Sequence, residues 1–258
     1  NEGGAWRGSG SLSAWAAPNF PSSPVITLLI DPEAFAGSEW IVEGEPYRHL
    51  FRARRTEVGA QIRVVDGRGS ARDSIVTNID RSTAKLQIGE VAPANEPSLS
   101  LDLFAPTLRP ERAAWMVEKA TELGISAIYF FNSERAPRSF EKNAIERLRR
   151  VAVAALEQCH RSLLPAMDGP FEFRGLEARV RALDRKWLLD PRAEGTDWPS
   201  EPTDTRAGLL LGPEGGLTET ERDLALAWGA TPVALGGRIL RIETAALVGT
   251  ARALVGRG

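Results

Sequence analysis

The sequence predicts an α/β protein in which a mostly parallel sheet follows a small β-rich domain. Two observations support this fold class. Up to residue 92, short apolar runs follow one another closely, whereas beyond residue 98 apolar runs alternate with amphipathic helical patterns. Closely spaced short strands indicate an antiparallel, barrel-like domain, and strand–helix alternation indicates a parallel sheet covered on both faces.

The composition of the chain excludes several classes of protein. The chain has 258 residues and a net charge of −2, so length allows two modest domains and global charge identifies no partner. Cys159 is the only cysteine, which excludes an intramolecular disulfide framework and favours a reducing compartment. One cysteine with two histidines cannot form a Cys/His zinc site, and we expect no metal. No apolar run reaches the roughly 18 to 20 residues of a membrane span.

The N-terminal third divides into a tail and a domain. Residues 1–24 are rich in Gly, Ser, Pro and Ala, so we expect a disordered tail or an expression remnant, with a truncated organelle-targeting segment as the alternative. Residues 25–97 are expected to form the β-rich domain, which ends at a Pro-containing linker. Glu45–Arg55 is predicted to be a short helix with proline in its first turn. The predicted strands are Val25–Ile30, Trp40–Glu43, Gln61–Asp66, Ser74–Ile79 and Lys85–Val91.

Residues 98–258 are expected to form the α/β domain, without internal repeats. Predicted strands are Leu99–Phe104, Ala127–Phe131, Trp187–Leu189, Leu209–Leu211 and Val233–Leu235. Predicted helices are Pro110–Leu123, Phe140–Cys159, Gly175–Ala182, Thr218–Ala227 and Glu243–Val255. In such folds ligands bind beyond the carboxyl ends of the parallel strands.

Two of these strands stop at glycine. Leu209–Leu211 is followed by Gly-Pro-Glu-Gly-Gly, and Val233–Leu235 by Gly-Gly-Arg. Glycine lets a backbone approach a ligand closely, so the pattern predicts one small ligand held by two neighbouring loops. The alternative is a tight turn before a helix, since Thr218 and Glu221 are spaced as a capping box. The GxxxxGK[ST] and GxGxxG phosphate motifs are absent.

Five stretches in order resemble the SPOUT-class methyltransferases that modify uridine N3 in small-subunit ribosomal RNA. The resemblance extends from about Val25 to the C-terminus. The family usually carries threonine where Ile242 stands and glycine where His160 stands. The matching stretches are Lys119–Gly124, Ser133–Arg135, Glu157–Arg161, Gly212–Gly216 and Gly236–Thr244.

The resemblance implies a PUA-like β-barrel that binds RNA, followed by a domain with a deep trefoil knot. It also implies a cytoplasmic homodimer, or one in an organelle of bacterial origin, that binds S-adenosylmethionine in the knot. The cofactor-binding residues implied are Leu189, Asp190, Pro191, Leu211, Gly212, Gly215, Gly216, Leu235, Gly236, Arg238, Ile239 and Leu240.

Methylation of uridine N3 requires removal of the N3 proton or stabilisation of charge on the uracil oxygens. Arginine suits the second task, and the family motifs implicate Arg135, Arg161 and Arg241. Glu134 and Glu243 are alternative proton acceptors, although Glu243 could equally stabilise a helix N-terminus.

The target uridine must be unpaired or flipped out, so a surface that grips RNA is expected. Arg48, Arg52 and Arg55 recur at helical spacing, with His49 and Arg54 beside them, and fit phosphate contacts. The alternative is a solvated helix face, which we favour for the second basic cluster, at residues 147–150. Two other functions stay open: a non-catalytic RNA-binding or ribosome-assembly factor, and methyl transfer to another RNA.

Overall fold

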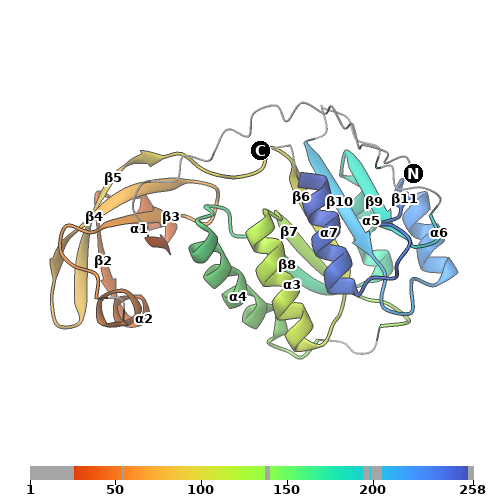
Figure 1. Ribbon diagram of the computed structural model, residues 1–258, viewed down its shortest axis with the longest axis horizontal. Helices are drawn as coiled ribbons and strands as arrows, with labels where there is room; N and C mark the ends of the chain where they lie inside the picture. Colours follow the sequence, from red (N-terminus) through yellow and green to blue (C-terminus); the bar gives the residue numbers. More distant parts are fainter. Residues whose placement is uncertain (1–25, 54, 137–139, 194–197, 199–204, 255–258) are drawn as a thin grey trace, which may run out of the picture.

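The computed structural model describes residues 26–53, 55–136, 140–193, 198 and 205–254, and these fall into two sheets (Figure 1). The tail predicted over residues 1–24 lies outside the described residues. No helix in the described ranges is long and apolar enough to cross a lipid bilayer.

The N-terminal sheet is curled and has five strands in the order β1-β3-β4-β5-β2. The central strands β3, β4 and β5 are antiparallel, as predicted, whereas β1 runs parallel to β3. The edge strands β1 and β2 do not pair with each other, so the sheet is open rather than a closed barrel. The strands are β1 (Ile26–Leu29), β2 (Glu39–Glu43), β3 (Gln61–Val65), β4 (Ala71–Ile79) and β5 (Thr83–Ala92).

The predicted helix of this domain is confirmed in two joined pieces, α2 (Gly44–Tyr47) and a π-helical turn η1 (Arg48–Ala53). Its apolar side packs on the sheet, because Leu50 and Phe51 are buried and the Tyr47 and Phe51 rings stack 5.3 Å apart. A short helix α1 (Pro32–Ala36), capped by Asp31, connects β1 to β2.

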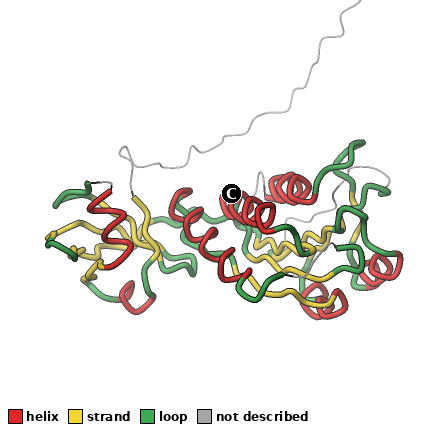
Figure 2. Tube along the Cα trace, turned by 90° about the horizontal axis from the view of Figure 1, so that it is seen from below, coloured by secondary structure: helices red, strands yellow, loops and turns green. Residues whose placement is uncertain are grey.

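The second sheet has six parallel strands in the order β11-β9-β10-β6-β7-β8. Apolar side chains alternate between its faces: Leu209 and Leu211 pack under one layer of helices, and Leu210 under the other. Figure 2 shows helices on both sides of the strands. The strands are β6 (Ser100–Pro106), β7 (Ala127–Asn132), β8 (Ala166–Glu172), β9 (Arg185–Leu189), β10 (Arg206–Leu211) and β11 (Thr231–Val233).

The helices divide into two layers. One face is covered by α3 (Pro110–Leu123), α4 (Ala144–Cys159) and α7 (Ile242–Leu254). The other face is covered by the 3₁₀ turn η2 (Phe173–Leu176), α5 (Glu177–Arg181) and α6 (Glu219–Ala227). The predicted mostly parallel sheet with helices on both faces is therefore confirmed.

The edge strand β8 was not predicted from the sequence. Its sequence, AMDGPFE, contains no apolar run, and proline is tolerated in an edge strand because one side of the ladder is unpaired. Gly169 has φ +118°, and a Cβ there would lie 2.3 Å from the Phe130 carbonyl oxygen. The Gly-Pro pair therefore belongs to an irregular strand that passes very close to β7.

The two sheets are joined through α4. The Leu29 N–H donates to Glu157 Oε1 at 3.1 Å, and Thr27 Oγ1 lies 2.8 Å from His160 Nδ1. His160 caps α4 with φ +62°, a left-handed conformation that glycine adopts most readily. The glycine usual in the family at this position is explained by that backbone conformation.

The C-terminal segment crosses the carboxyl edge of the second sheet. After the edge strand β11 the chain returns to α7, which packs beside α3 and against β6 and β10 (Figure 1). It thus passes over the ends of β9 and β10, which is the course expected of a knotted segment. The carboxyl ends of β9, β10 and β11 consequently face the segment that joins β11 to α7.

Candidate active site

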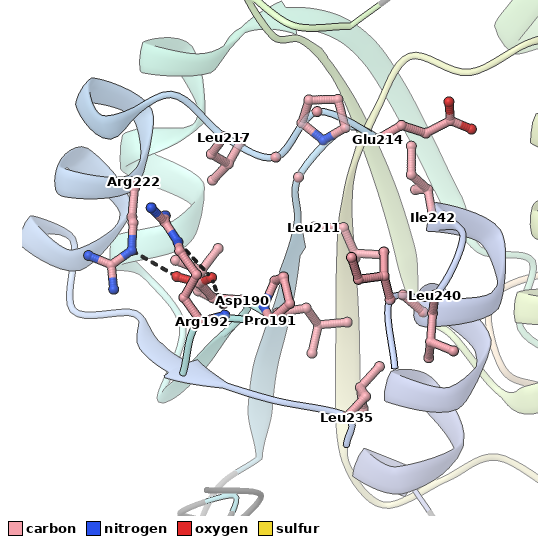
Figure 3. Close-up of a pocket in the computed structure, with 18 of the residues that line it drawn as sticks. Asp190, Pro191, Arg192, Leu211, Glu214, Leu217, Arg222, Leu235, Leu240 and Ile242 are labelled. Atoms are coloured by element: carbon pink, nitrogen blue, oxygen red, sulfur yellow. Dashed lines mark hydrogen bonds and ion pairs between the residues drawn. The ribbon is translucent and has the colours of Figure 1, made fainter. Parts of the chain in front are cut away.

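A pocket of about 380 Å³ lies at the carboxyl edge of the second sheet, where β9, β10 and β11 end. Its size is typical of a small-molecule site. Figure 3 shows the labelled wall residues Leu211, Leu235, Leu240 and Ile242 on one side and the group around Asp190 on the other. The structure brings all twelve expected cofactor residues to this pocket: Leu189, Asp190, Pro191, Leu211, Gly212, Gly215, Gly216, Leu235, Gly236, Arg238, Ile239 and Leu240.

The glycine loops shape the pocket in two ways. Between β10 and α6 the chain turns tightly, with the Gly216 N–H donating to the Pro213 carbonyl at 2.8 Å. A Cβ on Gly212 would lie 2.9 Å from the Leu217 nitrogen, so the turn has no room for a side chain there. Gly216 and Gly236 instead have positive φ, +71° and +116°, and open space beside them. The backbone is thereby exposed where a planar ligand could lie against it.

Asp190 is the buried charge of the pocket. Its carboxylate accepts from Arg222 Nε at 2.8 Å and from Arg192 Nε at 3.2 Å (Figure 3). Burial alone would raise the pKa of this carboxyl, but the hydrogen bonds from Arg222 and Arg192 outweigh burial and hold the pKa below its ordinary value. Asp190 is therefore ionised at neutral pH and fixes two arginines at the pocket wall.

Sequence reasoning missed Arg192 and Arg222. Arg192 follows the Asp-Pro pair after β9, and Arg222 follows the capping glutamate of α6. An arginine in the loop that follows a predicted strand is a usable signal for Arg192. Arg222 carried no such signal, because its approach to Asp190 depends on how α6 packs.

Arg135 reaches the pocket from β7. Its Nη1 donates to the carbonyl of Gly215 at 3.0 Å and of Leu217 at 3.4 Å. Since a guanidinium has five N–H groups, those on Nε and Nη2 have no acceptor among the described residues. Arg135 is thus anchored to the glycine loop and still presents donors at the pocket.

Arg241 lies at the rim. It is exposed and does not line the pocket, although its neighbours Leu240 and Ile242 both do. Ile242 contributes an apolar wall where the family usually has threonine. The hydroxyl of a threonine is therefore not required to close this wall.

Arg161, which the family motif implicates in catalysis, does not line the pocket. Arg161 precedes β8 and contacts the carbonyl of Ile125, just before β7, so it lies at the amino edge of the sheet, opposite the pocket. It is 3% exposed and donates to Glu96 Oε2 and to the Thr121 carbonyl. The family motif around Arg161 thus holds the linker between the two sheets.

The two alternative proton acceptors also lie outside the pocket lining. Glu134 is exposed. Glu243, on the first turn of α7, is 7% exposed and its Oε1 lies 3.8 Å from Arg112 Nε, while its Oε2 has no hydrogen-bond partner in the part of the chain that the structure describes. Arg112 also contacts Glu214 of the glycine loop, so it stands between two segments that border the pocket.

The residues expected to bind RNA lie far from the pocket, on the first sheet's helix. Arg48, His49 and Arg52 are exposed on η1, Arg55 is exposed just after it, and Arg52 donates to the Arg81 carbonyl at 2.7 Å. Arg54 lies outside the described residues. The second basic cluster pairs with acids along α4 as expected, through Arg147–Glu141, Arg149–Glu146 and Arg150–Glu146.

The two-part fold and its glycine-lined pocket are those of an RNA-modifying enzyme. Residues 95–254 match the family model of the RNA methyltransferase domain, and residues 42–89 match that of the RNA methyltransferase PUA domain. The chain belongs to the RNA methyltransferase family, which confirms the resemblance seen in the sequence.

Individual relatives agree with this assignment. Ribosomal RNA small subunit methyltransferase E of Synechocystis sp. is 29% identical over 230 residues, which cover 87% of this chain and 76% of that protein. The protein of the same name from Bacillus subtilis is 25% identical over 219 residues, covering 80% and 86%. A structure described as a methyltransferase from Legionella pneumophila in complex with the cofactor S-adenosylmethionine has a TM-score of 0.78 at 25% identity, covering 89% of this chain and 97% of that one.

Proposed function

We propose that this protein transfers a methyl group from S-adenosylmethionine to N3 of a uridine in small-subunit ribosomal RNA. The observation that carries the proposal is the position of Arg135, which lines the pocket and is tied to the glycine loop, while its Nε and Nη2 have no acceptor among the described residues. Relatives named for small-subunit ribosomal RNA methylation support the substrate class.

The residues of the pocket fit S-adenosylmethionine. Adenine is planar with apolar faces, which suits Leu211, Leu235 and Leu240, and the open backbone at Gly216 and Gly236 can approach it closely. When bound, S-adenosylmethionine supplies an electrophilic methyl group. The protein's own residues then have to place the uridine and manage the charge on it.

Arg135 is proposed to stabilise that charge. As N3 loses its proton, negative charge spreads onto the uracil oxygens, and a fixed cation with free N–H donors stabilises it. A guanidinium stays protonated at any physiological pH, so it acts without a change of its own protonation state. Arg241 at the rim is the second candidate for this contact.

The first domain is proposed to grip the RNA. Its exposed residues Arg48, His49, Arg52 and Arg55, together with Arg54, would contact phosphates while the target base is flipped toward the pocket. A ribosomal substrate favours a cytoplasmic location, or an organelle of bacterial origin.

A homodimer is proposed through the α3–α7 side of the second domain. Three large apolar side chains are exposed on α3, on α7 and just before α7: Trp115 at 45%, Val248 at 42% and Ile239 at 89%. Burying such residues against a second copy would stabilise the pair and enclose the loop that carries Ile239.

The test is methyl transfer to small ribosomal subunits or their free RNA, isolated from cells that lack this protein. We expect N3-methyluridine, identified by mass spectrometry of the digested RNA against a synthetic standard. Arg135→Ala should lower kcat about 10²- to 10³-fold. Folded protein that binds no S-adenosylmethionine in calorimetry would favour the non-catalytic assembly factor, and methylation at another base or RNA would favour the other alternative.

A further inference from the structure

Glu221 is a buried carboxylate with more hydrogen bonds than its place in a helix requires. It lies on the first turn of α6 and is 4% exposed. Oε2 accepts from the Thr218 N–H at 2.8 Å, from Thr218 Oγ1 at 3.2 Å and from Ser133 Oγ at 3.1 Å, and Oε1 accepts from the Glu134 N–H at 3.2 Å. Both carboxylate oxygens of Glu221 therefore accept hydrogen bonds from the protein.

Of these four contacts, only the bond from the Thr218 N–H belongs to the capping box. The box needs the Glu221 carboxylate at the Thr218 N–H and the Thr218 hydroxyl at the Glu221 N–H, and both bonds are present. The contacts with Ser133 and Glu134 come from the segment after β7, which is distant from α6 in the sequence. They join two segments that no sequence pattern links.

The segment joined in this way carries Arg135. Its backbone is held at Ser133 and Glu134, and the guanidinium returns to the Gly215 and Leu217 carbonyls. The Arg135 side chain also packs against Gly215, since a Cβ on that glycine would lie 3.5 Å from Arg135 Cβ and Cδ. The contacts close a ring through Glu221, Glu134, Arg135 and the glycine loop.

We propose that Glu221 is a positioning residue for the reaction: it fixes the backbone that aims Arg135 into the pocket. This inference rests on the proposed function, in which Arg135 stabilises charge on the uracil. A long arginine side chain has many rotamers, and holding it in one productive arrangement before the substrate arrives lowers the barrier to reaction. A carboxylate suits the role because all its neighbours are donors, whereas an amide would turn its NH₂ group toward one of them.

The central test is Glu221→Gln, with Asp223→Asn as a matched control. The control makes the same acid-to-amide change on an exposed side chain of the same helix. We expect kcat of Glu221→Gln to fall about 10- to 100-fold, while KM for RNA changes less than about threefold, because RNA is gripped elsewhere. Asp223→Asn should leave both values unchanged.

Two further variants separate positioning from capping. Ser133→Ala removes the bond to Glu221 and leaves the capping box whole, so kcat should fall although the protein stays folded at the assay temperature. Thr218→Ala removes the cap, so its main effect should be a lower thermal midpoint, with a smaller effect on kcat. If Ser133→Ala keeps full kcat and Glu221→Gln loses only stability, Glu221 is a capping residue alone and the proposal is overturned.

Hydrogen exchange gives a readout that does not depend on methyl transfer. We expect the amides of residues 133–136 to exchange faster in Glu221→Gln and Ser133→Ala, and at the wild-type rate in Asp223→Asn. If wild-type protein methylates no ribosomal RNA but this exchange pattern holds, the proposed function fails and the positioning contact stands. Unchanged exchange in Glu221→Gln would overturn the positioning contact whatever the activity.

Discussion

Glu96 and Arg161 form a buried ion pair, with 2.7 Å between Oε2 and Nη2, that fastens the linker between the sheets to the amino edge of the second sheet. Glu96 Oε1 also accepts from the backbone N–H groups of Ser162 and Leu163, at 2.8 and 2.9 Å. This one carboxylate therefore organises the turn between α4 and β8.

Arg161→Ala should destabilise the fold rather than the chemistry. The Glu96 carboxylate and the Thr121 and Ile125 carbonyls would lose their charged donor, which costs about 3–5 kcal/mol of unfolding free energy. Denaturant unfolding measures the loss, and calorimetry on the folded fraction should find unchanged affinity for S-adenosylmethionine. Arg147→Ala, at an exposed pair on α4, should change stability by less than about 0.5 kcal/mol. Weakened cofactor binding with intact stability would restore a role for Arg161 at the active site.

Gly216→Val should weaken cofactor binding through two effects. The left-handed backbone at φ +71° costs a side chain about 1–2 kcal/mol, and the new side chain would project into the open space beside the pocket. Calorimetry with S-adenosylmethionine measures the effect. Gly59→Val is the control, because Gly59 also has positive φ and open space but lies in the first domain. Equal losses of cofactor affinity in both variants would contradict the assignment of the loop.

Arg112→Ala should loosen both glycine loops at once. Arg112 contacts Glu214 in the first loop and lies 3.8 Å from Glu243, which directly follows the second. Without Arg112 the buried Glu243 carboxylate loses the guanidinium that lies 3.8 Å from it. We expect cofactor affinity to fall about tenfold, which corresponds to about 1.4 kcal/mol. Arg112→Lys should recover part of the loss, and Arg109→Ala, three residues earlier, should cause none.

Asp102 should make stability fall as pH rises. Burial on β6 raises the pKa of this carboxyl from 3.8 to about 6, against the opposing charge of Arg206. The folded state therefore binds a proton more tightly than the unfolded state, so the contribution of Asp102 is most favourable below about pH 4 and is lost as pH rises through about 6. Between these two limits the contribution of Asp102 to the unfolding free energy changes by about 3 kcal/mol.

Asp102→Asn tests this by removing the titration. The unfolding free energy of the variant minus that of the wild type should grow between pH 4 and pH 7, measured by urea denaturation. Asp223→Asn, the same acid-to-amide change at an exposed position of α6, is measured alongside as the control. A flat difference for Asp102→Asn would show that the Asp102 carboxyl has an ordinary pKa.

Arg48→Glu combined with Arg52→Glu should weaken RNA binding without affecting the pocket. Both side chains are exposed on η1, far along the chain from the cofactor loops. Loss of two phosphate contacts should lower the slope of log affinity against log salt by about 1.4 to 1.8. The same reversal at Arg147 and Arg150 of α4 is the control. Normal RNA binding by the Arg48 and Arg52 variant would show that these residues of the first domain do not bind the RNA.

Patterns that are local in sequence predicted most of this fold. The helix over Pro110–Leu123 coincides with α3, and the capping box of Thr218 with Glu221 is present, because both depend on neighbouring residues. The strand β8 escaped prediction because close contact with β7, rather than an apolar run, defines it.

For the same reason, only part of the candidate site could be predicted from the sequence. Glycine loops at strand ends mark a pocket in the sequence, and family motifs supplied its remaining expected residues. Motifs alone do not indicate whether an arginine lies at the carboxyl edge or at the amino edge of the sheet. Arg135 follows its strand and reaches the pocket, whereas Arg161 precedes its strand and lies at the opposite edge. The contact of Arg222 with Asp190 depends on the packing of α6, which no short pattern encodes.

The return of the chain from β11 to α7 has a consequence for synthesis on the ribosome. Ile242 and Ala245, on the first turn of the last helix, form one wall of the pocket. Translation delivers the other walls earlier, so a nascent chain cannot hold the cofactor until this helix has left the exit tunnel and docked beside α3. A chain that stops short of α7 therefore lacks this wall of the pocket.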